Sequence, residues 1–307
     1  MFINKNKIFN NKQLDITWSQ PSYVEKYIDL DKTWSWGQLP NFDLNESRLQ
    51  KPNSKIEGSI LEIGSATGGA YKFLKDSGVM SERVDYNGLD ISNHGINFCK
   101  KNYPNVNWIK QDLSIEKINK NYDYIFERIA VHHMLNPLEI FQNLSDKTNI
   151  SFSTSFVCCV YGDTISNLDV SRYRHESGEY VYFNIINIFE VLEILLSKFN
   201  LIHISYGGPH EKIYNDSTGF QYLSPEVDQD KRRIGRITIT ATITDKLDYK
   251  KIFFVNKQSQ LKSYIKKFLS IFYRKYRDDF GLIKPMVEKF INRKDGTTVY
   301  DSPYAPR

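Results

Sequence analysis

Short apolar runs alternate with amphipathic segments along the middle of the chain, from about residue 56 to about residue 245. Runs that are rich in β-branched and aromatic residues and bounded by turn residues are typical of strands. The segment 236–244 (RITITATIT) alternates polar and apolar residues, as a half-buried strand does. On this basis the sequence predicts strands at residues 59–63, 85–91, 107–110, 122–126, 150–160, 201–206 and 236–244.

Helices are predicted between most of these strands. Apolar residues recur at helical spacing within residues 181–199, Ser92 suits the N-cap of a helix that runs to Lys101, and Pro137 suits a first helical turn. Strands that alternate with helices predict an α/β fold, with a parallel sheet covered by helices on both faces. Residues 207–235 would join the last two strands as a long polar loop. The predicted helices cover residues 70–75, 92–101, 137–144 and 181–199.

The composition indicates a folded protein of one large or two smaller domains. A chain of 307 residues with 40% hydrophobic and 25% charged residues differs from disordered and collagen-like chains. Its three cysteines, at 99, 158 and 159, cannot form a disulfide framework, and their spacing indicates no zinc site. No apolar run reaches the roughly 18 residues of a membrane-spanning helix, and the N-terminus lacks the apolar core of a secretory signal. We therefore expect a reduced, cytoplasmic protein without a metal.

Charge is distributed unevenly along the chain. Residues 246–307 carry fifteen basic and six acidic residues, a net charge of +9, whereas the rest of the chain has a net charge of −4. Within this tail, residues 261–276 place apolar side chains on one helical face among lysines and arginines, which predicts a basic amphipathic helix. Such a helix can contact an anionic membrane surface, bind RNA, or dock on its own domain or a partner. We expect an N-terminal extension or lid (1–55), a central domain (56–245) and a basic helical C-terminal extension (246–307).

The first predicted strand ends in a glycine-rich turn, within the sequence LEIGSATGG of residues 61–69. Glycines permit a tight turn and let a ligand approach the backbone amides, and the following helix N-terminus favours negative groups. A phosphate-binding Walker loop would need lysine in place of Ala70, and a dinucleotide-binding turn would need glycine in place of Ala66. The pattern that remains is acid-x-Gly-x-x-x-Gly, which is formed by Glu62, Gly64 and Gly68.

This turn resembles motif I of class I S-adenosylmethionine-dependent methyltransferases. The resemblance extends over about residues 56–245 and implies a Rossmann-like, doubly wound sheet of seven strands, mostly parallel with an antiparallel last strand. It also implies S-adenosyl-L-methionine as the cofactor, with Glu62, Gly64, Ser65 and Gly68 among its binding residues.

Acidic residues at the ends of the next strands extend the resemblance. Asp90 stands where the family binds the ribose hydroxyls, and Asp112 stands where it faces the adenine amine. Ile91 and Leu113 follow these two residues and would enclose the adenine ring. Glu127, after the fourth strand, is a candidate partner for the amino group of the cofactor.

Two histidines lie where the resemblance places the methyl acceptor. A hydroxyl acceptor needs a base to remove its proton, and the pKa of histidine suits this role. His133 is the first candidate for this catalytic base and His132 the second, although the pair can also pack near the cofactor without moving protons.

The segment 169–182 follows the fifth predicted strand, where the family builds contacts to its acceptor. We expect either an ordinary solvated loop or a grip on an anionic or sugar-like substrate. The candidate substrate-binding residues are Arg172, Arg174 and His175.

The absence of two known motifs narrows the class of methyl acceptor that we expect. Residues 127–130 (ERIA) differ from the Asp/Asn-Pro-Pro-Tyr/Phe pattern of nitrogen-methylating enzymes, and Cys158 is not preceded by the proline of cytosine carbon-five enzymes. We therefore expect O-methylation of a small molecule, a sugar, or a glycolipid or polysaccharide precursor. An RNA methyltransferase that uses the basic tail, and a cofactor-binding protein without transfer activity, remain as alternatives. The oligomeric state stays open.

Overall fold

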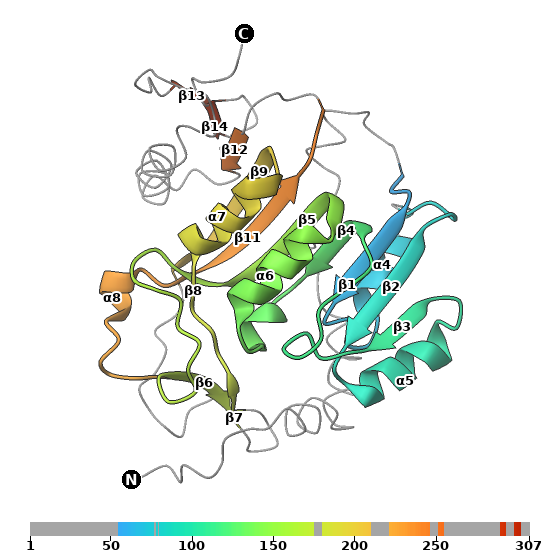
Figure 1. Ribbon diagram of the computed structural model, residues 1–307, viewed down its shortest axis with the longest axis horizontal. Helices are drawn as coiled ribbons and strands as arrows, with labels where there is room; N and C mark the ends of the chain where they lie inside the picture. Colours follow the sequence, from blue (N-terminus) through green and yellow to red (C-terminus); the bar gives the residue numbers. More distant parts are fainter. Residues whose placement is uncertain are drawn as a thin grey trace.

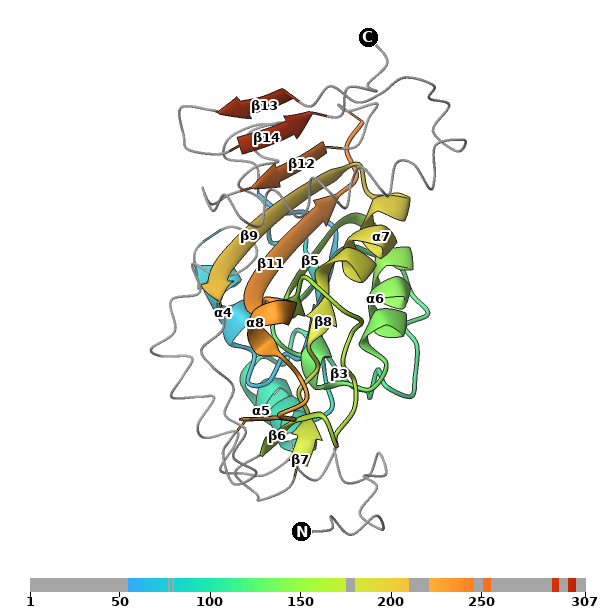
Figure 2. The same cartoon turned by 90° about the vertical axis from the view of Figure 1, so that its left-hand side faces the viewer.

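A computed structural model of the chain describes residues 55–76, 78, 80–174, 180–209, 221–245, 251–254, 289–292 and 298–301. These residues form a mixed α/β sheet with mostly parallel strands and with helices on both faces (Figures 1 and 2). The expected N-terminal extension, the expected amphipathic helix at 261–276 and His175 lie outside the described residues.

The centre of the sheet has the strand arrangement that the sequence predicts. The first five of its strands in chain order run parallel to one another, and β11 is antiparallel to both of its neighbours. The order across the sheet is β3 (Asn107–Lys110), β2 (Asp85–Asp90), β1 (Ser59–Ile63), β4 (Tyr122–Glu127), β5 (Thr148–Cys159), β11 (Gly235–Thr242) and β9 (Leu201–Pro209).

The sheet is larger than the seven strands expected. Within the described residues it has eleven strands, because β12 (Lys251–Phe254), β14 (Thr298–Asp301) and β13 (Lys289–Asn292) extend it beyond β9, and β8 (Ile186–Asn187) pairs with the end of β5. The short β12, β13 and β14 carry too little pattern to be recognised in the sequence, and backbone pairing at the edge of the sheet defines them. The described parts of the tail are therefore strands rather than helix.

The helices α4 (Gly69–Asp76) and α5 (Asn93–Asn102) lie on one face of the sheet, and α6 (Pro137–Asp146) and α7 (Ile188–Lys198) lie on the other (Figure 2). Apolar side chains of α4 and α5 pack with an aromatic cluster on the first face. On the other face, α6 and α7 bury the larger apolar core. Burial of these apolar faces, more than helix propensity, stabilises such short helices.

The helix boundaries follow from capping. The Ser92 side chain accepts a hydrogen bond from the Gly95 amide at 3.1 Å, which confirms the predicted N-cap of α5. The helix predicted from residue 181 begins only at Ile188, because the Asn187 side chain accepts hydrogen bonds from the Phe189 and Glu190 amides. Before this cap, the chain forms strands rather than helix.

Segments expected to be loops form a second, smaller sheet. Its three antiparallel strands are β10 (Gln221–Leu223), β6 (Ser171–Arg174) and β7 (Tyr180–Tyr182), in that order. The short helix α8 (Gln229–Arg232) follows β10. The long connection between β9 and β11 thus contributes one strand of this sheet, where the sequence predicts only polar loop.

The connection between β3 and β4 contains no helix. A cavity of about 540 Å³ lies between this connection and the face of the sheet that also packs against α6. Apolar side chains of β1, β2 and β3 form its floor, and residues 116–120 form much of its rim.

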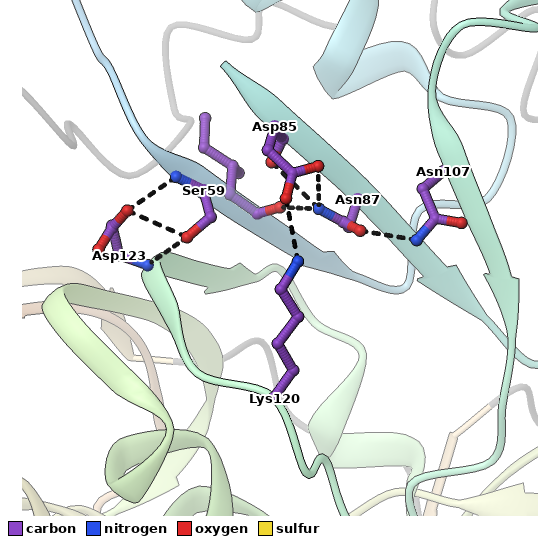
Figure 3. Close-up of polar contacts among 7 residues, drawn as sticks. Ser59, Asp85, Asn87, Asn107, Lys120 and Asp123 are labelled. Atoms are coloured by element: carbon purple, nitrogen blue, oxygen red, sulfur yellow. Dashed lines mark hydrogen bonds and ion pairs between the residues drawn. The ribbon is translucent and has the colours of Figure 1, made fainter. Parts of the chain in front are cut away.

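Polar side chains join the amino-terminal ends of the central strands (Figure 3). Asp123 at the start of β4 accepts hydrogen bonds from the Ser59 amide at 2.8 Å and from its hydroxyl at 3.0 Å. Asn107 donates to Asn87 at 2.7 Å, which links β3 to β2. These contacts fix the relative register of neighbouring strands at the end of the sheet that lies away from the glycine-rich turn.

We predict that Asp123→Ala destabilises the protein by about 1–3 kcal/mol, because a partly buried amide and hydroxyl lose their acceptor. Urea unfolding measures this change. Lys120→Ala is the matched control, since its ion pair with Asp85 is exposed and contributes at most about 1 kcal/mol. Equal stabilities of the two variants would contradict this role of Asp123.

Candidate functional site

The glycine-rich turn is held between two neighbouring strands. The backbone amides of Gly64 and Ser65 both donate to the carbonyl of Leu89 in β2, at 2.8 and 3.0 Å. Gly64 has a φ of +72°, and a Cβ atom there would lie 2.6 Å from the Cβ of Ala130. Glycine is required at this position both by the backbone conformation and by the close approach of the turn that follows β4.

Asp90 at the end of β2 ties the turn to the start of α5. One carboxylate oxygen accepts the Ala66 amide at 2.8 Å and the other accepts the Ser92 amide at 2.7 Å. Burial raises the pKa of Asp90, and these amide hydrogen bonds oppose that rise. Each carboxylate oxygen can accept more than one hydrogen bond, so Asp90 retains acceptor capacity for a ligand.

Two buried polar atoms in the predicted cofactor-binding segments have no hydrogen-bond partner among the described residues: Oδ2 of Asp112 and Oγ of Ser65. The other oxygen of Asp112 accepts the Ser114 amide at 2.8 Å, which fixes the carboxylate. A buried acceptor without a donor is unfavourable, so Oδ2 of Asp112 is suited to a ligand that donates a hydrogen bond. An exocyclic amine is such a donor.

The other predicted cofactor residues lie in different surroundings. Gly68 has a φ of +77°, and a Cβ there would lie 2.9 Å from the ring of Tyr103. Glu62 is buried and accepts a hydrogen bond from the Tyr86 hydroxyl at 2.7 Å. Ile91 is half-buried, whereas Leu113 packs into the larger apolar core.

Glu127 braces the turn after β4. One carboxylate oxygen accepts the Ala130 and Val131 amides at 2.9 and 3.2 Å. The other accepts the Ser155 amide at 3.2 Å and the Thr154 hydroxyl. Burial raises the pKa of Glu127 to about 7. A direct contact with the amino group of a cofactor would have to compete with these four protein donors.

The braced turn carries the two histidines. Ile129 has a φ of +60°, which is unfavourable for a β-branched residue. Nδ1 of His133 lies 2.7 Å from the carbonyl oxygen of Tyr182, and Nε2 of His133 lies 2.8 Å from Nε2 of His132. Because a carbonyl only accepts, we assign the proton of His133 to Nδ1, so that its Nε2 accepts from His132. Both nitrogens of His133 are therefore engaged within the protein.

Two of the predicted substrate-binding residues, Arg172 and Arg174, lie in different surroundings. Arg172 is only 5% exposed and lies in the middle strand of the second sheet, so it does not belong to a solvated loop. Arg174 is exposed at the end of the same strand. The tyrosines that surround Arg172, at 180 and 222, are not among the residues that the sequence singles out. No arginine lies next to either tyrosine in the sequence, so the local pattern gives no signal for this contact.

Burial makes the adjacent cysteines poor nucleophiles. The pKa of Cys159 is raised to about 11, and that of Cys158 is also raised. Within the described ranges, no three His, Cys, Asp or Glu residues are grouped so that they could hold a metal ion. In the same ranges, no helix combines the length and the apolar character needed to cross a lipid bilayer.

No protein-family model matches the sequence, and no curated protein matches it. One similar solved structure is the O-methyltransferase from the trans-AT PKS multienzyme of Brevibacillus brevis in complex with S-adenosyl-L-homocysteine. It is 13% identical, with a TM-score of 0.46, and the match covers 87% of this chain and 92% of that chain.

Two further solved structures show comparable similarity. The N-terminal domain of EvdMO1 in the presence of SAH and D-fucose is 11% identical, with a TM-score of 0.43 and coverage of 65% of this chain and 82% of that chain. Magnesium protoporphyrin IX methyltransferase from Synechocystis PCC 6803 with bound SAM is 13% identical, with a TM-score of 0.37 and coverage of 76% and 85%. At these values, the similarity adds no argument about chemistry, which rests on the residues described above.

We predict that Glu127 makes the stability of the protein pH-dependent. Its folded-state pKa of about 7 exceeds the ordinary 4.5, so its contribution to stability is present below pH 4.5 and is lost as the pH rises through 7. The loss is about 3 kcal/mol. Glu127→Gln cannot titrate and should flatten this part of the pH dependence in urea unfolding between pH 5 and 8.

Glu82→Gln, at an exposed position, is the matched control and should keep the wild-type pH dependence. If Glu127→Gln keeps it as well, another group causes the effect.

Proposed function

We propose that this protein is an S-adenosyl-L-methionine-dependent methyltransferase. Two carboxylates support this most: Asp90, which holds the glycine-rich turn and keeps acceptor capacity, and Asp112, whose buried Oδ2 has no hydrogen-bond partner among the described residues. An adenosyl group offers ribose hydroxyls and an exocyclic amine, which are the donors that these two carboxylates need.

The residues present fit this cofactor. Asp90 would hold the ribose, Asp112 the adenine amine, and Ile91 one face of the adenine ring, while the turn at Gly64–Gly68 would lie against the rest of the molecule. When bound, the cofactor supplies an electrophilic methyl group on a sulfonium. The protein contributes orientation of the acceptor and exclusion of water.

We propose that His132 and His133 act as a pair on the proton of a hydroxyl acceptor. The hydrogen bond from His133 to the Tyr182 carbonyl fixes the orientation of its ring, and the contact between the two Nε2 atoms links the second imidazole. A proton that reaches this pair can be shared between the two rings, so the pair rather than His133 alone is the unit to test.

We propose an oxygen atom as the methyl acceptor, in a small molecule, a sugar, or a glycolipid or polysaccharide precursor. Two observations support this choice: the histidine pair is suited to remove a hydroxyl proton, and the segment after β4 lacks the nitrogen-methylation pattern. The second sheet lies beside the pair, since the ring of Tyr173 is 5.7 Å from the ring of His133.

We predict that Asp90→Ala weakens binding of S-adenosylmethionine about 10- to 100-fold, because charge-assisted hydrogen bonds to the ligand and the anchor of the turn are lost together. Titration calorimetry measures the affinity. Asp85→Ala, at the exposed other end of β2, is the control and should bind as the wild type does. Wild-type affinity in Asp90→Ala, or no binding by the wild type, would refute the proposed cofactor site.

We predict that His133→Ala lowers methyl transfer about a hundredfold or more without changing cofactor affinity, since the proton-sharing pair is broken but the cofactor site is kept. Transfer of labelled methyl groups to lysate fractions (metabolites, RNA, lipids and polysaccharide) measures the rate and identifies the acceptor class. His94→Ala, on the exposed side of α5, should retain wild-type transfer. An unchanged rate in His133→Ala excludes the proton role, and label in RNA alone would favour the RNA-modifying alternative.

A further inference from the structure

The second sheet places both of its arginines and three of its four tyrosines on one face. In the antiparallel register, Arg172 lies opposite Tyr182 on β7 and opposite Tyr222 on β10, and Arg174 lies opposite Tyr180. Residues that are directly opposite, or two apart along a strand, share a face of the sheet. Two arginines and three tyrosines therefore share one face, while Val181 and Leu223 on the other face are fully buried.

Two tyrosine rings, one from each neighbouring strand, lie close to the guanidinium of Arg172. The guanidinium carbon lies 4.1 Å from the centre of the Tyr222 ring and 4.8 Å from that of the Tyr180 ring. Cation–π contacts at these distances stabilise and orient the planar group. The N–H groups at its edge form its hydrogen bonds.

Not all N–H groups at the edge of the Arg172 guanidinium form hydrogen bonds with the described residues. One terminal nitrogen of Arg172 donates to the Leu168 carbonyl at 3.1 Å, whereas the buried Nε has no hydrogen-bond partner in the described part of the chain. Among the described residues, no carboxylate forms an ion pair with this guanidinium. A guanidinium remains charged at any physiological pH, and a buried charge without a counter-ion is costly. Within the described residues, the buried guanidinium of Arg172 therefore has no anionic partner, and a bound anion would compensate its charge.

The histidine pair contacts the small sheet from its other face. The backbone carbonyl of Tyr182, the register neighbour of Arg172, accepts the hydrogen bond from Nδ1 of His133. The His133 ring lies 5.7 Å from the ring of Tyr173, which alternates to the face opposite Arg172 and packs there with Leu223. These contacts therefore do not place a ligand of Arg172 beside the histidine pair.

We propose that Arg172, between Tyr180 and Tyr222, binds an oxyanion group of a small-molecule ligand, either a carboxylate or a phosphate. Both groups accept paired hydrogen bonds from the edge of a guanidinium. This anion site does not depend on the proposed methyl transfer.

The test observes the guanidinium directly. In the full-length, ¹⁵N-labelled protein, the Nε–H signal that disappears in Arg172→Lys is followed by NMR during titration with inorganic phosphate or with acetate, at constant ionic strength set with chloride. We expect a saturable shift of this signal with at least one of the two probes, and the stronger probe identifies the preferred oxyanion. The signal of the exposed Arg174 is the internal control and should not show saturation.

A matched pair of variants tests the contact with the Tyr222 ring. Tyr222→Phe keeps the ring and should keep the affinity for the stronger probe, whereas Tyr222→Leu removes it and should weaken binding at least fivefold. If Arg172→Lys does not fold, through-bond NMR experiments assign the Arg172 signal in the wild type, so the titration remains decisive. No saturable shift with either probe would overturn the proposal and leave Arg172 as a structural element of the small sheet.

Calorimetry with S-adenosylmethionine on the same sample separates the two proposals. Cofactor binding without a response of Arg172 would overturn the oxyanion site alone. A response of Arg172 without cofactor binding would refute the proposed methyltransferase function and keep the anion site.

Discussion

The carboxylate of Asp90 holds together the part of the structure on which the proposed chemistry depends. Its two oxygens accept the Ala66 amide from the glycine-rich turn and the Ser92 amide at the start of α5. Without the Asp90 carboxylate, the Ala66 and Ser92 amides would each lose this hydrogen-bond acceptor, and the turn would lose its link to α5. A ligand that binds here therefore meets a turn and a helix start whose relative positions are already fixed, which lowers the ordering cost of binding.

A second set of contacts connects this turn to the histidine pair. Gly64 admits the close approach of Ala130, and Glu127 holds the amides of Ala130 and Val131 in place. The unfavourable backbone of Ile129 persists because the surrounding contacts over-determine it. The glycine-rich turn and the proposed proton-transferring residues are thus held by one connected set of contacts, as a reaction with strict alignment requires.

The sequence predicts the fold well where the hydrophobic pattern and the turn residues at its ends indicate the same element. The strands at Ser59–Ile63 and Asn107–Lys110 have the predicted boundaries, because the first is a mostly apolar run before a glycine-rich turn and the second ends just before Gln111 and Asp112. The strands of three or four residues in the second sheet and in the tail are too short to show a period. They exist through backbone pairing with segments that are distant in the chain.

The candidate site shows the same division. The places of Asp90 and Asp112 at strand ends follow from the strand pattern, and the structure brings both next to backbone amides. The surroundings of Glu127 and Arg172 do not follow from it, because their partners come from elsewhere in the sequence. Thr154 and Ser155 reach Glu127 from the next strand, and Tyr222 reaches Arg172 from the long connection before β11. Local pattern cannot reveal such partners.

The pairing of β12 with β9 has a practical consequence for work on the basic tail. Residues Lys251–Phe254 cover the hydrogen-bonding edge of Leu201–Ile204, which would otherwise stand open at the side of a large sheet. Uncovered edges of this kind recruit strands from other molecules and promote aggregation. Shortening the chain at residue 245 would thus change its solubility as well as its charge. Charge-reversing substitutions within the tail separate these two effects more cleanly than truncation does.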